Sequence, residues 1–326
     1  MLEFSENSPV YESDHDLDKQ LDDGPLDPLF GTAGQFRVIH KLGRGGLATV
    51  WLCRDQETQK YVALKIIIAD ESRDESSELW LANREGLDFG EAGGEYIAVP
   101  REYFWLDGPN GRHLCLVLPA SGPRVSALWG AFKDPASVSR DIALQVTRGL
   151  HFLHKNGICH GDFRPSNILL RLYGFNDLSE QDLLGEPNKE PLVTISEESP
   201  APSGPEYLVD SLNLDRLPAR FTSDQISIID FGESYDMHSP PADLGITASF
   251  RSPELLFDNT RTIGVGCDFS RAQFTKFGQT APCLRISWTT TTRSSCKWCR
   301  CLGSSRNHGG VLGKHGGGGT TRVRRR

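Results

Sequence analysis

Short runs of apolar residues, each interrupted by polar turn-forming residues, begin after residue 35 of the chain. The runs FRVIHKLG, TVWLCRD and YVALKIII are rich in β-branched and aromatic side chains, and a glycine-rich turn and the segment DQETQK separate them. These runs predict three consecutive antiparallel strands between residues 36 and 68. The later stretch YIAVPREYFWLDGPNGRHLCLVLP predicts two further strands joined by a DGPNG turn.

Two segments have helical character instead. Residues 71–89 have helical composition and an acidic beginning, which suits the N-terminus of a helix. In VSRDIALQVTRGLHFLHKNG, apolar side chains recur at helical spacing and Gly157 follows as the expected C-cap. Residues 173–223 lack clean periodicity and predict a surface insertion, after which QISIIDFG predicts another strand.

The composition of the 326 residues is that of a soluble globular protein, with 38% hydrophobic residues and a mean hydropathy of −0.37. We find no run of about 18 apolar residues, so we expect no transmembrane helix. The N-terminus is acidic where a signal peptide needs basic and then apolar residues. The eight cysteines follow no disulfide framework, which fits a reducing compartment. We therefore expect an intracellular protein of the cytoplasm, the nucleus or both, with no membrane partner.

Charge divides the chain near residue 268. Residues 269–326 hold 12 Lys or Arg and no Asp or Glu, whereas the first 268 residues hold 23 basic and all 43 acidic residues. Such a switch marks a boundary. Residues 1–34 are acidic and rich in Asp, Gly and Pro, which predicts a disordered arm.

A glycine-rich turn and a strand lysine supply the first candidate chemistry. Glycines let backbone N–H groups approach phosphate oxygens that a Cβ would hold away, although a turn of this kind is most often only a tight hairpin. Lys65 in VALK has apolar neighbours, so its buried stem requires an anionic partner for the ammonium. The turn and the two strands that flank it contain Leu42, Gly43, Arg44, Gly45, Gly46 and Val50.

Two acidic motifs follow in the second half of the chain. In HGDFRPSN, Asp162 and Asn167 are five residues apart on a predicted loop and can face one cavity. The carboxylate can accept a hydroxyl proton, and the amide oxygen can bind a hard cation. Asp230 in DFG ends a predicted strand, and with Asn167 it offers the oxygen ligands that Mg²⁺ prefers.

The glycine-rich turn, VALK, HGDFRPSN and DFG, in this order, resemble a eukaryotic protein kinase over about residues 36–268. KLGRGGLATVWL, the long spacer before DFG, RSPELL and GVGCD resemble the SR-protein-kinase group and its fungal relatives. The resemblance implies an α+β, two-lobed fold with an antiparallel N-lobe at 36–118 and a partial, mainly helical C-lobe at 119–268.

Residue roles follow from the same resemblance, with ATP and Mg²⁺ as cofactors. Lys65 is expected to bind the nucleotide phosphates and a helix glutamate, for which Glu85 is our choice and Glu78 the alternative. Asp162 is expected to act as base, Arg164 to contact the γ-phosphate, and Asn167 and Asp230 to hold Mg²⁺. The remaining expected nucleotide contacts are Ala63, the gatekeeper Leu118, and Pro119 and Ser121 of the hinge, together with the glycine-rich turn.

The chain also departs from the common kinase pattern. Ala48 stands at the third glycine position of the loop. Gly161 stands where many kinases have an arginine that binds a phosphorylated activation loop, so we expect activity that does not depend on that phosphorylation. His160 is expected to be a core histidine. Cys53, Cys115, Cys159 and Cys267 are expected to be small buried apolar residues, and Glu254 is expected to close the peptide-binding segment.

The predicted function is therefore ATP-dependent phosphorylation of serine or threonine in a protein substrate, with Arg/Ser-rich substrates implied only by the resemblance. The alternative is a catalytically dead pseudokinase fragment that binds nucleotide or acts as a scaffold. A basic nucleic-acid-binding tail on a kinase N-lobe ranks lowest, and we expect no direct nucleic-acid partner.

The basic tail, residues 269–326, does not resemble the helices that complete a kinase C-lobe. A zinc site at Cys296, Cys299, Cys301 and His308 has cramped spacing, which argues against it. A shifted reading frame fits better: the codons of Trp288-Thr289 force an aspartate, and those of Trp298-Cys299 force a valine. Selected codons elsewhere give strings that resemble C-lobe helices. We therefore expect the tail to be aberrant and disordered. The chain as written is then expected to be insoluble or inactive, whereas the frame-corrected gene is expected to encode an active kinase.

Overall fold

The computed structural model describes residues 29–31, 34–108, 111–125, 135–184, 192–194, 207–209, 211–217 and 219–241. Several expectations therefore lie outside the described residues. These concern the acidic arm, most of the insertion, Glu254, Cys267 and the basic tail.

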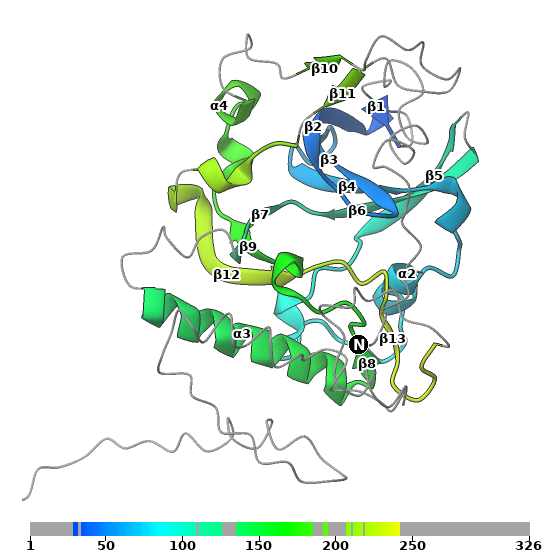
Figure 1. The fold of residues 1–326 in the computed structure, drawn as a ribbon, viewed down its shortest axis with the longest axis vertical. Coiled ribbons are helices and arrows are strands. Elements are labelled where there is room, and N and C mark those ends of the chain that lie inside the picture. The colour runs from blue at the N-terminus through cyan, green and yellow to red at the C-terminus, as the bar shows by residue number, and fades with distance from the viewer. Residues whose placement is uncertain are drawn as a thin grey trace, which may run out of the picture. The chain divides into compact units, whose positions relative to one another are not determined.

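The predicted strands form one antiparallel sheet in the order β1-β2-β3-β4-β6-β5 (Figure 1). The pairs on either side of β4 and the hairpin at the far edge all run antiparallel. The five strands expected from the apolar runs are confirmed, and a two-residue strand is added at one edge. The strands are β1 Leu29–Phe30, β2 Phe36–Arg44, β3 Ala48–Asp55, β4 Tyr61–Ile67, β5 Glu102–Gly108 and β6 Gly111–Pro119.

One face of this sheet is a closed apolar core. Alternate residues of β4, namely Val62, Leu64 and Ile66, are buried there against Trp51 of β3 and Val117 of β6. Since side chains alternate between faces along a strand, Ala63 and Lys65 belong to the other face. The cysteines at 53, 115 and 159 are buried and free of disulfides, as expected. Burial raises the pKa of Cys115 to about 12, so this thiol behaves as an apolar side chain.

The helix predicted at residues 71–89 is much shorter in the structure. A 3₁₀ turn, η2 Ala69–Glu71, is followed by α2 Ser77–Ala82, whose N-cap Ser76 accepts a hydrogen bond from the Leu79 N–H. After α2 the chain turns at Gly86 and Gly93, both with positive φ. Helical composition alone could not show that α2 ends at Ala82, before these glycines.

The second predicted helix is confirmed as α3 Pro135–Lys155, and Gly157 follows in the left-handed conformation. The predicted apolar face, which includes Ile142, Val146 and Leu150, is buried in the second core. α3 packs on β12 Thr222–Ile228, the strand expected before DFG (Figure 1). This strand lies in a small sheet of order β12-β9-β7, with β9 Ile168–Leu172 and β7 Ser121–Arg124.

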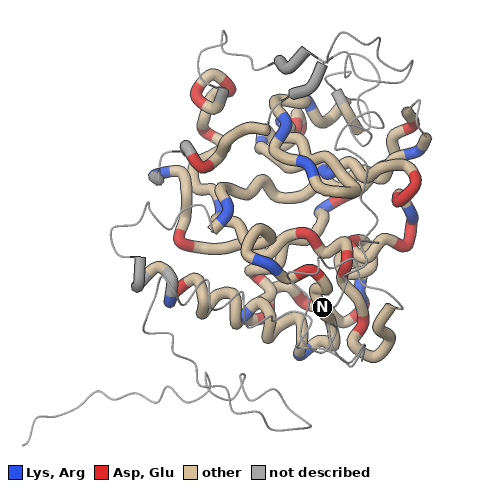
Figure 2. Tube along the Cα trace, in the orientation of Figure 1, with Lys and Arg blue, Asp and Glu red and all other residues tan. Residues whose placement is uncertain are grey.

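The described residues of the predicted insertion make specific contacts with the sheet. Phe175, Leu178 and Leu212 pack around Leu52 of β3 and Tyr61 of β4. Acidic and basic positions are interspersed along the described fold (Figure 2).

Further short elements complete the described fold. They are β8 Ile158–Cys159 with its partner β13 Tyr235–Asp236, β10 Leu192–Thr194 with β11 Tyr207–Val209, α4 Glu180–Leu184, and the turns η3 Gly94–Tyr96, η5 Pro165–Asn167, η6 Phe175–Asp177, η7 Leu214–Arg216 and η8 Ala219–Phe221.

Candidate active site

Strand register gathers the expected nucleotide-binding residues of the sheet on its other face. Lys65 of β4 lies opposite Val50 of β3, and Ala63 lies opposite Leu118 of β6. Directly opposite residues of antiparallel strands project to the same face, so these four side chains share one surface. Leu42 of β2 packs in the cluster around Leu52, which belongs to this same face.

The glycine-rich turn connects β2 to β3, and its glycines are not needed by the fold. Gly45 N–H donates to the Ala48 carbonyl at 2.8 Å, which closes the turn. A Cβ added at Gly43 or Gly46 would meet no atom within 4 Å. The turn therefore has free space that side chains could fill without harm to the chain itself. Space of this kind next to exposed backbone N–H groups is suited to a phosphate group.

Lys65 is the centre of the charged network. Its Nζ atom lies 2.8 Å from Oε1 of Glu78 and 2.7 Å from Oδ1 of Asp230. The Lys65 side chain is only 14% exposed. Burial lowers the pKa of Lys65, but the charges of Glu78 and Asp230 outweigh it, so the pKa is raised overall and the ammonium is retained.

The structure corrects our choice between the two glutamates. The partner of Lys65 is Glu78, whereas Glu85 is exposed in a turn beyond the end of α2. Composition favours Glu85 because it predicts a longer helix than the one that forms, and Glu85 would lie well inside it. The signal in the sequence is the apolar context of Glu78 in ELWL, two residues after the capping residue Ser76.

Asp230 lies in a left-handed backbone conformation, with φ of 65°. A non-glycine residue with this conformation stores strain, which is most often found at functional sites. Burial raises the pKa of Asp230, but the Lys65 ammonium outweighs this effect and holds the pKa below its usual value. The carboxylate form that could bind a cation is therefore favoured at neutral pH.

The HGDFRPSN loop is held by internal hydrogen bonds. The Asn167 side-chain amide donates to the Asp162 carbonyl at 2.9 Å and to Asp162 Oδ2 at 3.2 Å. His160 is fully buried, and one of its ring nitrogens lies 3.0 Å from the Ile229 carbonyl, so its expected role as a core residue is confirmed. Its ring also packs 4.6 Å from that of Phe231 in DFG. These two contacts of His160 join the HGDFRPSN loop to the DFG segment.

Asp162 and Arg164 form an ion pair of 2.9 Å between Oδ2 and Nε. The Nε–H is buried but not directed at an acceptor in hydrogen-bond geometry, so this guanidinium is incompletely satisfied. Burial raises the pKa of Asp162 above its usual value, and Arg164 and Asn167 only partly oppose this. A carboxyl group with a raised pKa is a better proton acceptor once it is ionised.

The donor set fits a magnesium ion. Because Asn167 uses its amide nitrogen to bind Asp162, its amide oxygen is the atom left to bind a cation. Asp230 uses Oδ1 for Lys65 and has a second carboxylate oxygen. Carboxylate and amide oxygens are the ligands that Mg²⁺ takes from proteins, with phosphate and water completing its shell.

The backbone explains why position 161 is a glycine. Its φ is 83°, and a Cβ built there would lie 2.0 Å from the Glu233 carbonyl oxygen. Neither an arginine nor any other side chain fits between these two backbone segments as they stand.

At the other end of the site, Pro119 ends β6 and Ser121 begins β7, so the expected hinge lies where the chain leaves the large sheet.

Residues 36–179 match the protein kinase domain family. Over this stretch the chain is similar to protein kinase domains. Protein kinase dsk1 of Schizosaccharomyces pombe is 35% identical over 144 residues, which are 42% of this chain and 26% of that protein. SRSF protein kinase 3 of Homo sapiens is 34% identical over 146 residues, or 42% of this chain and 25% of that protein.

Serine/threonine-protein kinase SKY1 of Saccharomyces cerevisiae is 29% identical over 148 residues, or 42% of this chain and 20% of that protein. The chain thus spans a fifth to a quarter of the length of these curated relatives. A solved crystal structure of a kinase domain is 18% identical, with a TM-score of 0.47 and coverage of 74% of this chain and 64% of that one.

In the part of the chain that the structure describes, each helix is too short or too polar to cross a membrane.

Proposed function

We propose that this chain binds ATP with Mg²⁺ and transfers its γ-phosphate to serine or threonine of a protein substrate. The contact that carries the proposal is the pair of bonds from Lys65 to Glu78 and Asp230. A buried lysine held between a helix carboxylate and the DFG carboxylate is suited to bind phosphate oxygens.

Nucleotide binding involves the face of the sheet that carries Lys65. Val50, Ala63 and Leu118 offer an apolar surface for the adenine ring beside Lys65. Pro119 lacks an N–H, so the hinge would offer adenine its carbonyl groups. The glycine-rich turn supplies backbone N–H groups to the phosphates, with Arg44 at the end of β2 beside them.

The chemical step follows from the HGDFRPSN loop. Asp162, oriented by Asn167, would accept the proton of the substrate hydroxyl, and Arg164 would stabilise negative charge on the γ-phosphate. Mg²⁺ bound by Asn167 and Asp230 would neutralise phosphate charge and align the triphosphate. An Arg/Ser-rich substrate is proposed because relatives such as SRSF protein kinase 3 carry that substrate in their names.

The test uses the full chain and a fluorescent ATP analogue, followed by phosphate transfer to an Arg/Ser peptide. We expect Mg²⁺-dependent binding that Asp230→Asn weakens at least 10-fold. Asp162→Asn should retain binding and lose transfer by 10²–10⁴-fold. Glu85→Gln is the matched control, since this exposed acid touches none of the site.

Absence of nucleotide binding in the folded chain would contradict the proposal. Binding with no transfer, unchanged by Asp162→Asn, would instead support the pseudokinase fragment. The basic composition of residues 269–326, where kinases have C-lobe helices, favours this second candidate.

A further inference from the structure

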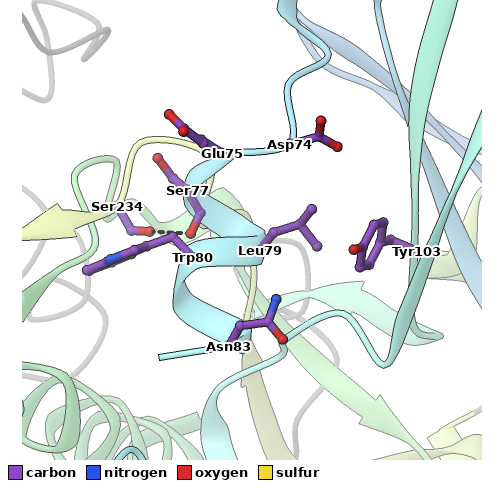
Figure 3. A pocket seen from close by; sticks show the side chains of 8 residues that line it. All are labelled: Asp74, Glu75, Ser77, Leu79, Trp80, Asn83, Tyr103 and Ser234. Carbon is purple, nitrogen blue, oxygen red and sulfur yellow. Dashed lines mark hydrogen bonds between the residues drawn. The ribbon is translucent and has the colours of Figure 1, made fainter. Parts of the chain in front are cut away.

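Helix α2 carries Glu78 but is too short to be stable without contacts to the rest of the fold. Its six residues are fewer than the roughly 12–15 that an isolated helix needs to be even marginally stable in water. Leu79 and Leu81 pack into two separate apolar clusters, but apolar packing is non-directional and does not fix where the Glu78 carboxylate points. An open cleft of about 560 Å³ runs along another flank, lined in part by Trp80 and Asn83 (Figure 3).

The first end of α2 touches the segment that follows DFG. The Ser234 hydroxyl donates to the Phe231 carbonyl at 2.8 Å and lies 3.5 Å from the Ser77 carbonyl. Figure 3 shows this serine beside the first turn of α2. A hydrogen bond of 3.5 Å is weak, so this contact guides the helix without fixing it.

The chain just past the C-terminal end of α2 is bound more firmly, at Arg84, two residues after Ala82. Nη2 of Arg84 lies 2.8 Å from Oδ2 of Asp236 in β13. The Arg84 guanidinium also lies over the Trp80 ring, 4.8 Å from its centroid. The two charged side chains are 24% and 31% exposed, so the pair is partly shielded from solvent. Stacking and ion pairing together give the guanidinium one defined orientation.

Contacts other than the ion pair with Arg84 also orient Asp236. Its backbone is paired with Ile158 of β8, and its Oδ1 accepts the His238 N–H at 2.8 Å. The His238 hydrogen bond and the Arg84 pair lower the pKa of Asp236 despite its burial. The carboxylate thus has one oxygen committed to its own strand and the other directed to α2.

We propose that Arg84 is a positioning residue: its ion pair with Asp236 fixes the end of α2 on β13 and so keeps Glu78 within reach of Lys65 without any phosphorylated residue. The proposal rests on the proposed function for the role of Lys65 in nucleotide binding. It adds a connection between α2 and the segment after DFG that replaces the arginine absent at Gly161.

The test measures hydrogen exchange of the Trp80 and Asn83 amides, whose N–H groups donate to carbonyls of Ser76 and Leu79. In the nucleotide-free full chain, Arg84→Ala and Asp236→Ala should each speed this exchange at least 10-fold. The double variant should be no faster than either single variant, because both remove the same interaction. Each single variant should also weaken binding of the fluorescent ATP analogue at least 5-fold.

The charge-exchanged variant Arg84→Asp/Asp236→Arg should restore most of the protection and affinity. Lys155→Ala is the matched control: it breaks another ion pair, 2.7 Å to Glu91, and should change neither readout. Unchanged α2 exchange, additive single effects, or equally faster exchange in β12 would overturn the proposal. If α2 responds as expected but the wild-type chain binds no nucleotide, the connection stands and the proposed function fails.

Discussion

Nζ of Lys65 lies 2.8 Å from Oε1 of Glu78, so the central strand β4 and the short helix α2 share a buried ion pair. Removal of one partner of a buried pair leaves an uncompensated charge, which is strongly unfavourable. Asp230 provides Lys65 with a second carboxylate at 2.7 Å. Lys65 therefore remains charged when Glu78 is lost, but it is drawn toward Asp230 alone.

The first prediction concerns this choice of partner. Glu78→Gln should weaken Mg-ATP binding by about 10–100-fold, because Lys65 would then pair with Asp230 and leave the phosphate site. Glu85→Gln should leave affinity unchanged. Fluorescence titration of both variants measures the difference, and an equal loss in the two would show that Glu78 has no special role.

The second prediction concerns the pH dependence of Asp162. Burial raises the pKa of Asp162, and the neighbouring Arg164 opposes that rise. A raised pKa in the folded state means that the basic form is lost as pH falls through it, so transfer should decline at a higher pH than for an ordinary aspartate. Arg164→Ala should move the acidic limb to still higher pH.

The carboxyl ¹³C shift of Asp162, titrated in the full chain, measures the same pKa without need for activity. The sign for stability is opposite to that of an acid whose pKa is lowered on folding. The folded state binds this proton more tightly, so stability falls as pH rises past the unfolded pKa. A titration in Arg164→Ala at unchanged or lower pH would refute the role given to Arg164.

The third prediction concerns Gly161. An alanine there would adopt an unfavourable positive φ and would place Cβ 2.0 Å from the Glu233 carbonyl oxygen. We expect a loss of about 2–4 kcal/mol in the free energy of unfolding, from backbone strain and forced displacement together. Denaturant unfolding of the full chain gives the value, and a change below about 0.5 kcal/mol would show that the two segments separate easily.

The fourth prediction concerns Gly46, where an added Cβ meets no atom within 4 Å. Gly46→Ala should preserve or slightly raise stability, by up to about 1 kcal/mol, because the unfolded chain loses freedom. It should nevertheless weaken nucleotide binding several-fold by holding phosphate away from the backbone. Equal affinities for Gly46→Ala and wild type would indicate that this turn is only a hairpin.

The strands and α3 could be predicted because their apolar residues repeat with the period of the structure they form. The position of Glu78 could not, since residues 71–89 carry helical composition without a regular apolar stripe, and α2 occupies only Ser77–Ala82 of this stretch. The Arg84–Asp236 pair joins residues 152 apart in sequence. A sequence does not show which of its many charged residues form ion pairs at such separation. The pairing becomes visible only in the folded structure.

The close backbone approach at Gly161 also limits how this domain could acquire control by phosphorylation. An arginine at this position would require the Glu233 segment to move first, and that segment leads directly to Asp236 and its contact with α2. Stepwise evolution toward a phosphate-gated site by this path would therefore first displace the segment whose Asp236 pairs with Arg84.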